Sequence, residues 1–227
     1  MHPITKVVNK HVLPIYDEPI IYYPIKTLLD AGIEDILVIS NADHIGKYMK
    51  LLELEFDADF SYRVQSEPKG IAHGLSLAEE FVGEDNVAVI LGDNILFGDA
   101  SDHIRRFDEV NSGAQIFLKR VDKPSAYGVA TVEDGKVTEL NEKPDSPTSD
   151  WAVIGLYLYT SRVFERIDQT EPSDRGEYEI TDVNQLYVDE RNLTYSEFTG
   201  EWFDVGTPEG LFQASKHVHD NRGTSDR

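Results

Sequence analysis

Two aspartates stand where a sheet could present them for chemistry. Asp93 follows the apolar run 87–91 and a glycine, and Asp204 ends a short run just before Val205 and Gly206. Ligands collect at the carboxyl ends of strands in open α/β sheets, and paired carboxylates there can hold a divalent cation against phosphate oxygens. An aspartate is also an ordinary turn residue. Together the two positions predict a magnesium site, provided that the fold brings both carboxylates to one cleft.

Further residues could bind a phosphorylated ligand. Lys10 lies in a loop with prolines and Lys143 directly precedes Pro144, so either ammonium could neutralise phosphate, although a solvated surface lysine is the commoner case. Gln65 carries both a donor and an acceptor, which suits the edge of a nucleobase. Gly70 precedes a helical stretch, where its backbone could meet a ligand or simply begin the helix.

Weaker patterns have plainer explanations. Asp57 and Asp59 form the D-x-D pattern of nucleotide-sugar glycosyltransferases, but a turn accounts for them better. No third metal ligand is evident near His217 and His219, which favours a solvated helix end. Asn192 begins a glycosylation sequon that matters only in an exported chain.

The chain is strongly acidic. It has 42 acidic against 21 basic side chains, a formal net charge of −21. Such a surface repels nucleic acids and anionic membranes, so neither is expected as a partner, and a phosphorylated substrate must be bound locally by a few cations and a metal. Because the acidic residues are spread along the chain, we also expect adaptation to high salt, with a folding stability that rises in molar salt on refolding.

Composition excludes several other classes. A hydrophobic content of 40% in 227 residues suffices for a packed core. No stretch approaches the roughly 18 consecutive apolar residues of a membrane span, and the start has no hydrophobic signal region, which predicts a cytoplasmic protein. The absence of cysteine excludes disulfides, thiolate metal sites and a cysteine nucleophile.

Hydrophobic periodicity predicts helices alternating with strands up to about residue 120, and hence an α/β fold with a mainly parallel mixed sheet flanked by helices. Residues 19–40 form the first helix–strand unit, with Gly32 at the end of its helix. We expect one domain over 1–219 and a disordered tail at 220–227. The other expected elements are helices near 44–52, 71–81, 162–167, 181–188 and 208–219, strands at 60–64, 87–91, 153–159 and 193–199, and a hairpin at 127–140 with Asp134-Gly135 at its turn.

A series of segments in order carries a more specific resemblance. From about residue 2 to 215 the chain resembles the sugar-1-phosphate nucleotidyltransferases, and within them the glucose-1-phosphate thymidylyltransferases. The resemblance implies a Rossmann-like nucleotidyltransferase fold in which a sugar phosphate oxygen attacks the α-phosphate of dTTP or UTP and pyrophosphate leaves. The segments are Val8 to Pro19, Leu91 to Asn94, Tyr127-Gly128-Val129, Glu142-Lys143-Pro144, Gly155-Leu156-Tyr157, Arg175 to Asp182 and Trp202 to Thr207.

By position, the resemblance implies that Asp93 and Asp204 hold Mg²⁺, that Lys10 neutralises the nucleotide phosphates and that Lys143 holds the sugar phosphate. Such chemistry needs positioning and charge neutralisation more than a protein base. The nucleotide half would be about 1–120 and the sugar-phosphate half about 121–219, in a possible homo-oligomer. Base contacts would fall on Gln65 and Gly70, and the sugar pocket on Tyr127, Gly128, Glu142, Gly155 and Trp202.

One departure concerns the start of the chain. Members of this family begin with a strand and a Gly-Gly-x-Gly-Thr-Arg loop around the triphosphate, whereas this sequence starts with Met1-His2-Pro3, beyond that point. Without that central strand the sheet would have unpaired backbone groups and an apolar slot. We expect the true start to lie upstream. The alternative is a truncated, catalytically weak or dead subunit that binds or assembles around a nucleotide sugar, and a glycosyltransferase is a third reading. The choice between thymine and uracil stays open, because one methyl group is worth only about 1–3 kcal/mol.

Overall fold

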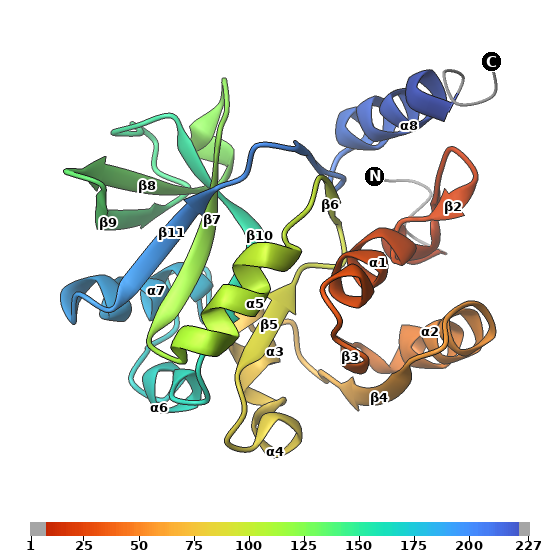
Figure 1. The fold of residues 1–227 in the computed structure, drawn as a ribbon, viewed down its shortest axis with the longest axis horizontal. Coiled ribbons are helices and arrows are strands. Elements are labelled where there is room, and N and C mark those ends of the chain that lie inside the picture. Colours follow the sequence, from red (N-terminus) through yellow and green to blue (C-terminus); the bar gives the residue numbers. More distant parts are fainter. Residues whose placement is uncertain (1–7, 223–227) are drawn as a thin grey trace.

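The computed structural model describes residues 8–222 and places β10 (Trp151–Tyr159) at the centre of a curled, six-stranded mixed sheet (Figure 1). β10 pairs antiparallel with β7 along one edge, and with β5 and β8 along different parts of its length. Its register on β7 shifts between Val153 and Tyr157, around Gly155. The other strands of this sheet are β5 (Val87–Ile90), β7 (Ala114–Arg120), β8 (Gly128–Glu133), β9 (Lys136–Glu142) and β11 (Leu193–Glu197).

Three smaller sheets complete the strand pairing. β3 (Asp35–Ser40) runs parallel to β4 (Asp59–Val64), and β1 (Pro14–Ile15) pairs with β2 (Glu18–Pro19). β6 (Asn94–Phe97) pairs antiparallel with β12 (Glu201–Asp204), so that Asp204 lies opposite Asn94. That register joins two segments more than a hundred residues apart in the sequence.

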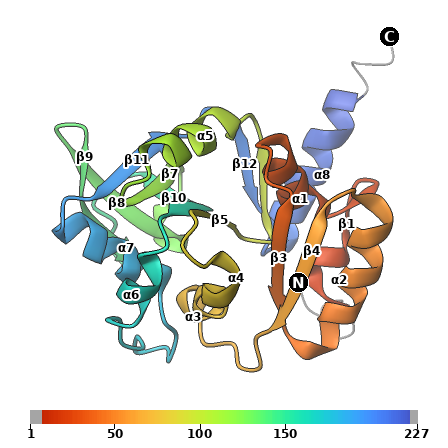
Figure 2. The ribbon, with the colours of Figure 1, turned by 60° about the horizontal axis from the view of Figure 1, so that its bottom comes forward.

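Helices cover both faces of the large sheet (Figure 2). On one face, α5 packs against the strand residues Phe117, Leu156 and Leu158, and on the other, α6 and α7 pack against their neighbours in β7 and β10. This alternation follows from the two-residue period of a strand. The helices are α1 (Tyr22–Asp30), α2 (Ala42–Glu55), α3 (Ile71–Ser76), α4 (Glu79–Val82), α5 (Ser101–Val110), α6 (Val163–Ile167), α7 (Ile180–Asp189) and α8 (Pro208–Arg222), with 3₁₀ turns at Lys10–Val12 and Pro124–Ala126.

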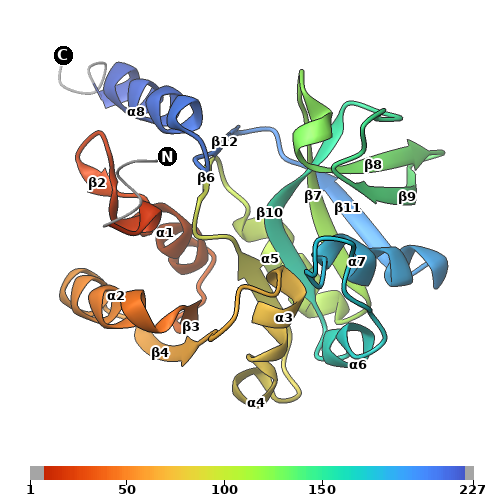
Figure 3. The ribbon, with the colours of Figure 1, turned by 180° about the vertical axis from the view of Figure 1, so that it is seen from behind.

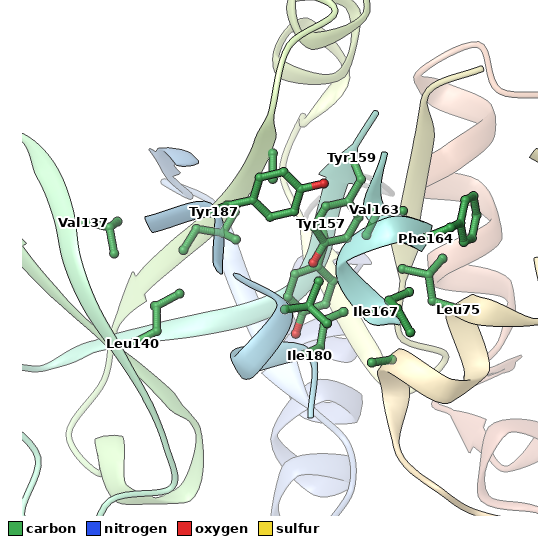
Figure 4. Close-up of a cluster of buried hydrophobic side chains, with 14 of the residues drawn as sticks. Leu75, Val137, Leu140, Tyr157, Tyr159, Val163, Phe164, Ile167, Ile180 and Tyr187 are labelled. Carbon is green, nitrogen blue, oxygen red and sulfur yellow. The ribbon is translucent and has the colours of Figure 1, made fainter. Parts of the chain in front are cut away.

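Three buried tyrosines form the centre of the core under α6 and α7 (Figure 4). The rings of Tyr157 and Tyr159 stack with centroids 6.2 Å apart, and Tyr159 stacks on Tyr187 at 6.0 Å. The Tyr159 hydroxyl donates to Asn184 at 2.7 Å, which satisfies its polar end inside the core. This rigid packing fixes the position of β10, which carries Gly155 to the site.

The sheet is interrupted between β3 and β5 (Figures 1 and 3). Within residues 8–222, β3 pairs only with β4, and β5 pairs only with β10. A cavity of about 1060 Å³ lies between them, lined by residues 36–39 and 87–91 among others. All four residues of β5 are apolar, yet each is only half-buried. Within residues 8–222, an apolar slot therefore separates β3 from β5.

Both strands run toward the same end of this slot, which we call the strand slot. At the C-terminal end of β3, Ser40 lies within hydrogen-bonding distance of the Tyr48 hydroxyl, which contacts His11. Just after β5, Gly92 packs against the ring of the same His11. The two strands are thus aligned, and their shared end lies beside His11 and Gly92, the residue before Asp93.

The α/β fold with a mixed sheet is confirmed, and several details differ from expectation. Parallel pairing is confined to β3–β4 and β11–β7 in the described chain, because β10 runs back antiparallel to its neighbours. The helix expected at 71–81 is divided into α3 and α4. Residues 220–222, expected in the tail, belong to α8, and 223–227 lie outside the described residues. Within 8–222, no helix is long and apolar enough to cross a membrane.

Candidate active site

Asp93 and Asp204 lie side by side at the end of the β6–β12 pair. The Val205 amide donates to the Asp93 carbonyl at 2.9 Å, which ties the two strand ends together. A Cβ placed on Gly206 would stand 3.0 Å from Asp204 Oδ1 and 3.8 Å from Asp93 Oδ2, so the carboxylates converge on one point. Both line a cavity of about 160 Å³. The fold therefore meets the condition on which the predicted cation site depends.

The two carboxylates have opposite electrostatic environments. Burial alone would raise the pKa of Asp93, but the Lys10 ammonium, which contacts Oδ2, and the Asn94 amide together bring it below the ordinary value. Burial raises the pKa of Asp204, and the negative charge of the nearby Asp93 raises it further. The Gly206 amide, which donates to Asp204 Oδ1 at 2.9 Å, lowers this pKa but does not cancel the increase. The folded chain thus stabilises a charge on Asp93 and opposes one on Asp204.

This pair fits a divalent cation that also binds a ligand. Mg²⁺ is usually held by one or two carboxylates together with water and substrate phosphates. In the described chain, no group of three or more His, Cys, Asp or Glu side chains could hold a metal ion alone. A cation between Asp93 and Asp204 would also relieve the repulsion that raises the Asp204 pKa.

Lys10 is held in place by its neighbours. The 3₁₀ turn Lys10–Val12 is capped by the Asn9 side chain, which accepts from the His11 amide at 2.8 Å. His11 Nδ1 lies 2.9 Å from the hydroxyl of Tyr48, which is buried in α2. Burial lowers the pKa of His11 to about 4, so its ring is neutral at pH 7. The Lys10 ammonium is consequently the cation of this turn that faces Asp93.

The residues predicted for a sugar pocket gather around the 160 Å³ cavity, beside the two aspartates. Glu142 is the most constrained of them: Thr181 Oγ1 donates to its Oε2 at 2.6 Å, and Lys143 Nζ and Arg175 Nη2 lie 3.2 and 3.3 Å from its Oε1. The predicted residues that line this cavity are Tyr127, Gly128, Glu142, Lys143, Gly155 and Trp202.

Arg175 is a cation at the site to which sequence reasoning gave no role. It lies between α6 and α7, where its Nη2 also donates to Glu179 at 2.9 Å. With Glu142 and Lys143, it lines the 1060 Å³ cavity. Its place at the start of the 175–182 segment, one of those that carry the resemblance, was the available signal.

Asn94 links three parts of the site and was likewise missed. This side chain is only 4% exposed, and its Oδ1 accepts from the Gly155 amide at 2.9 Å and from Trp202 Nε1 at 2.7 Å. Because both of those groups are donors, the Nδ2 group must face Asp93, whose Oδ1 lies 3.2 Å away. The sugar-pocket wall and the Asp93 carboxylate therefore share one buried amide.

Gly155→Ala tests this arrangement. A Cβ at Gly155 would lie 2.6 to 2.8 Å from the Asn94 side-chain atoms, so one of the two must move. We expect a loss of about 1–3 kcal/mol in the free energy of unfolding, measured by thermal or denaturant unfolding. In the matched control, Gly46→Ala in α2, no atom lies within 4 Å of the new Cβ, and stability should rise by about 0.5–1 kcal/mol. Equal effects of the two substitutions would contradict the packing described here.

Gln65 and Gly70 lie apart from the aspartates, on the 1060 Å³ cavity. Gly70 has φ 95°, and a Cβ there would stand 2.4 Å from the Tyr178 carbonyl oxygen, so close backbone packing accounts for the glycine. Gln65 Nε2 donates to the Gly70 carbonyl at 3.2 Å. Since Glu142 and Lys143 line both cavities, the two cavities adjoin.

The weaker sequence patterns do not join the site. Asp57 and Asp59 line neither cavity, and Asp59 begins β4. The His217 ring packs on Phe97, with centroids 4.4 Å apart, and His219 pairs with the adjacent aspartate on α8. The loop before β4 and its first residue account for the aspartates, packing against Phe97 accounts for His217, and an exposed position on α8 accounts for His219.

Residues 1–221 match the family model described as nucleotidyl transferase. The chain belongs to this family. Its sequence is 40% identical to that of the glucose-1-phosphate thymidylyltransferase of Neisseria meningitidis over 225 residues, which are 96% of this chain and 78% of the relative. It is 36% identical to the low-salt glycan biosynthesis nucleotidyltransferase Agl11 of Haloferax volcanii, over 100% of this chain and 65% of that protein.

Solved structures agree with this membership. A structure assigned to a glucose-1-phosphate thymidylyltransferase of Bacillus anthracis, in complex with sucrose, has a TM-score of 0.92 at 43% identity and covers 97% of this chain and 90% of its own. A UDP-glucose pyrophosphorylase with UDP-glucose bound has a TM-score of 0.83 at 25% identity, with 97% and 94% covered. The nucleotidyltransferase fold and enzyme class expected from the sequence are confirmed.

Proposed function

We propose that this nucleotidyl transferase condenses a sugar 1-phosphate, in the first place glucose 1-phosphate, with dTTP or UTP to give a nucleotide sugar and pyrophosphate. The convergence of Asp93 and Asp204 beside Lys10, in a pocket that Glu142 and Trp202 also line, carries this proposal. The names of the relatives support the same substrates. The high negative charge elsewhere supports small phosphorylated substrates over nucleic acid.

In this proposal Asp93 and Asp204 hold Mg²⁺, which supplies charge neutralisation at the phosphates when bound. Lys10 leaves Asp93 for the nucleotide phosphates, and Lys143 with Arg175 holds the sugar phosphate. Glu142 orients the sugar, since Thr181 fixes its carboxylate at 2.6 Å. Catalysis then rests on alignment of the sugar phosphate oxygen with the α-phosphate and on charge neutralisation.

We further propose that an extended strand occupies the strand slot in the active enzyme. The half-buried apolar β5 and the aligned, unpaired edges of β3 and β5 support this, because a strand between them would satisfy both edges. Within residues 8–222 no strand pairs with these two edges, so backbone pairing there is incomplete at the end of the sheet next to Asp93. Binding of a nucleotide sugar without turnover, for a chain whose slot is not filled by a strand, is the alternative function raised by the sequence.

The test is pyrophosphate release from dTTP or UTP, glucose 1-phosphate and Mg²⁺, by the 227-residue chain and by a version extended upstream in frame with its own coding sequence. We expect release from the extended version at the least. Absence of release from both would reject the transferase. Tight nucleotide-sugar binding without release from either would favour the binding subunit instead.

A further inference from the structure

The Gln65 amide has an orientation that its neighbours impose. Its nitrogen lies 3.2 Å from the Gly70 carbonyl oxygen and 2.9 Å from His73 Nδ1. A backbone carbonyl can only accept a hydrogen bond, so the side of the amide that faces it must be the NH₂ group. The opposite orientation would place two acceptor oxygens against each other.

This orientation also decides the tautomer of His73. Because the amide nitrogen can only donate, Nδ1 of His73 must accept and carry no proton, which leaves the ring proton on Nε2. The two amide hydrogens are thus divided between Gly70 and His73. Both donors of Gln65 are used inside the protein.

The carbonyl oxygen of Gln65 is left for a ligand. Within residues 8–222 no group donates to Oε1. This oxygen is also not buried, so a ligand can reach it. A Cβ on Gly74 would be 3.6 Å from it, an ordinary contact. Gln65 lines the 1060 Å³ cavity, where the family resemblance places the base, so this acceptor is available to a base bound there.

His73 is itself held by the sugar-phosphate half. Its ring stacks on Tyr178 with centroids 6.4 Å apart and planes at 29°. The Tyr178 backbone is anchored on both sides: its amide donates to Lys69 at 2.8 Å, and its carbonyl accepts from Ala72 at 3.2 Å. The ring position that sets the Gln65 amide therefore depends on the segment that also carries Arg175.

We propose that His73 is a positioning residue for base selection: it fixes the Gln65 amide so that the carbonyl oxygen accepts from the N3–H of a pyrimidine. Thymine and uracil carry that proton, whereas N3 of cytosine is an acceptor and would meet the carbonyl with two lone pairs opposed. This inference rests on the proposed function for the presence of a nucleotide in the cavity. It adds the residue that fixes the orientation of the Gln65 amide.

Calorimetric binding of dTTP, UTP and dCTP tests the proposal on the chain as it exists. The wild type should bind dTTP and UTP more tightly than dCTP. His73→Phe keeps a ring against Tyr178 but removes the acceptor. It should lower the dTTP/dCTP affinity ratio by about twofold to tenfold, which is the contribution of one neutral hydrogen bond. His73→Gln restores an acceptor and should recover the ratio.

The matched control is His103→Phe. His103 Nδ1 contacts Ser196 at 3.0 Å, its ring packs on Phe117, and it lines neither cavity, so the same substitution there should leave the ratio unchanged. A wild-type ratio in His73→Phe would overturn the proposal. So would a wild-type chain without a preference for dTTP and UTP over dCTP, whether it binds all three equally or none.

The ¹⁵N chemical shifts of the His73 ring give a second readout that needs no turnover. An unprotonated Nδ1 and a protonated Nε2 are expected at neutral pH, and the reverse tautomer would overturn the proposal. Selective binding with this tautomer, but no pyrophosphate release from either the 227-residue chain or the extended version, would reject the proposed function and leave the inference standing. The two can thus fail separately.

Discussion

Asp93→Asn and Asp204→Asn are each expected to lower kcat for pyrophosphate release by at least about a hundredfold, because each removes half of the carboxylate pair that would hold the cation. Their effects on stability should differ in sign. The pKa of Asp93 is lowered in the fold, so its charge stabilises the folded chain above its ordinary pKa, and this contribution is lost as pH falls. The pKa of Asp204 is raised, so its charge destabilises the fold at neutral pH.

At pH 7, Asp93→Asn should therefore lower the unfolding temperature and Asp204→Asn should leave it equal or raise it. Thermal unfolding beside the activity assay checks both statements. Asp57→Asn and Asp59→Asn serve as controls, since neither side chain lines a cavity, and both should keep wild-type rates. Wild-type rates in the Asp93 and Asp204 variants would refute the cation site, and a loss confined to Asp57 and Asp59 would point to the glycosyltransferase.

Lys143→Gly should lower the kcat/KM for the sugar phosphate strongly without lowering the free energy of unfolding. Lys143 has φ 44°, a left-handed conformation that costs a non-glycine residue about 1–2 kcal/mol, and Pro144 follows it. Glycine relieves this strain, partly offset by its greater freedom in the unfolded chain, so stability should be unchanged or higher by up to about 1 kcal/mol. The kcat/KM for the sugar phosphate should fall by about tenfold to a hundredfold through loss of a charged contact.

Two further substitutions separate the effect of backbone strain from the effect of the lysine charge. Lys143→Met keeps the strained backbone and removes the ammonium, so it should lose the same activity without a gain in stability. Asn111→Gly relieves a similar left-handed residue, φ 47° at the end of α5, and should affect stability alone. If Lys143→Gly kept the wild-type kcat/KM, the strained lysine would have no part in binding the sugar phosphate.

The strand-end positions of Asp93 and Asp204 could be predicted from the sequence because they depend on local features. An apolar run followed by Gly-Asp marks the end of β5, and Asp204 ends β12 just after two aromatic residues and shortly before Gly206. The alternation of apolar residues also placed α2, α7 and β10 within a few residues of their ends. α5 and β7 were not predicted, although both have regular hydrophobic patterns.

Asn94 and His73 could not be assigned from the sequence because their roles depend on distant partners. Asn94 meets Trp202 only because β6 and β12 pair in a particular register, 108 positions apart. The role proposed for His73 depends on Tyr178, more than a hundred residues later, because stacking on Tyr178 fixes the position of the His73 ring. The share of antiparallel pairing was underestimated for the same reason: helix–strand alternation indicates a crossover but not that β10 will insert between β5 and β7.

The break between β3 and β5 affects how the molecule comes apart. In the described chain, the unit of β3, β4 and α2 has no ladder of backbone bonds to the large sheet and adheres through side chains such as Ile36 and Val38 against Ile90. Without that ladder, this unit should open at a lower free energy than the tyrosine-centred core, as a separate foldon. Amides of β3 and β4 should then exchange with deuterium well before those of β7 and β10, and proteases should cleave there first.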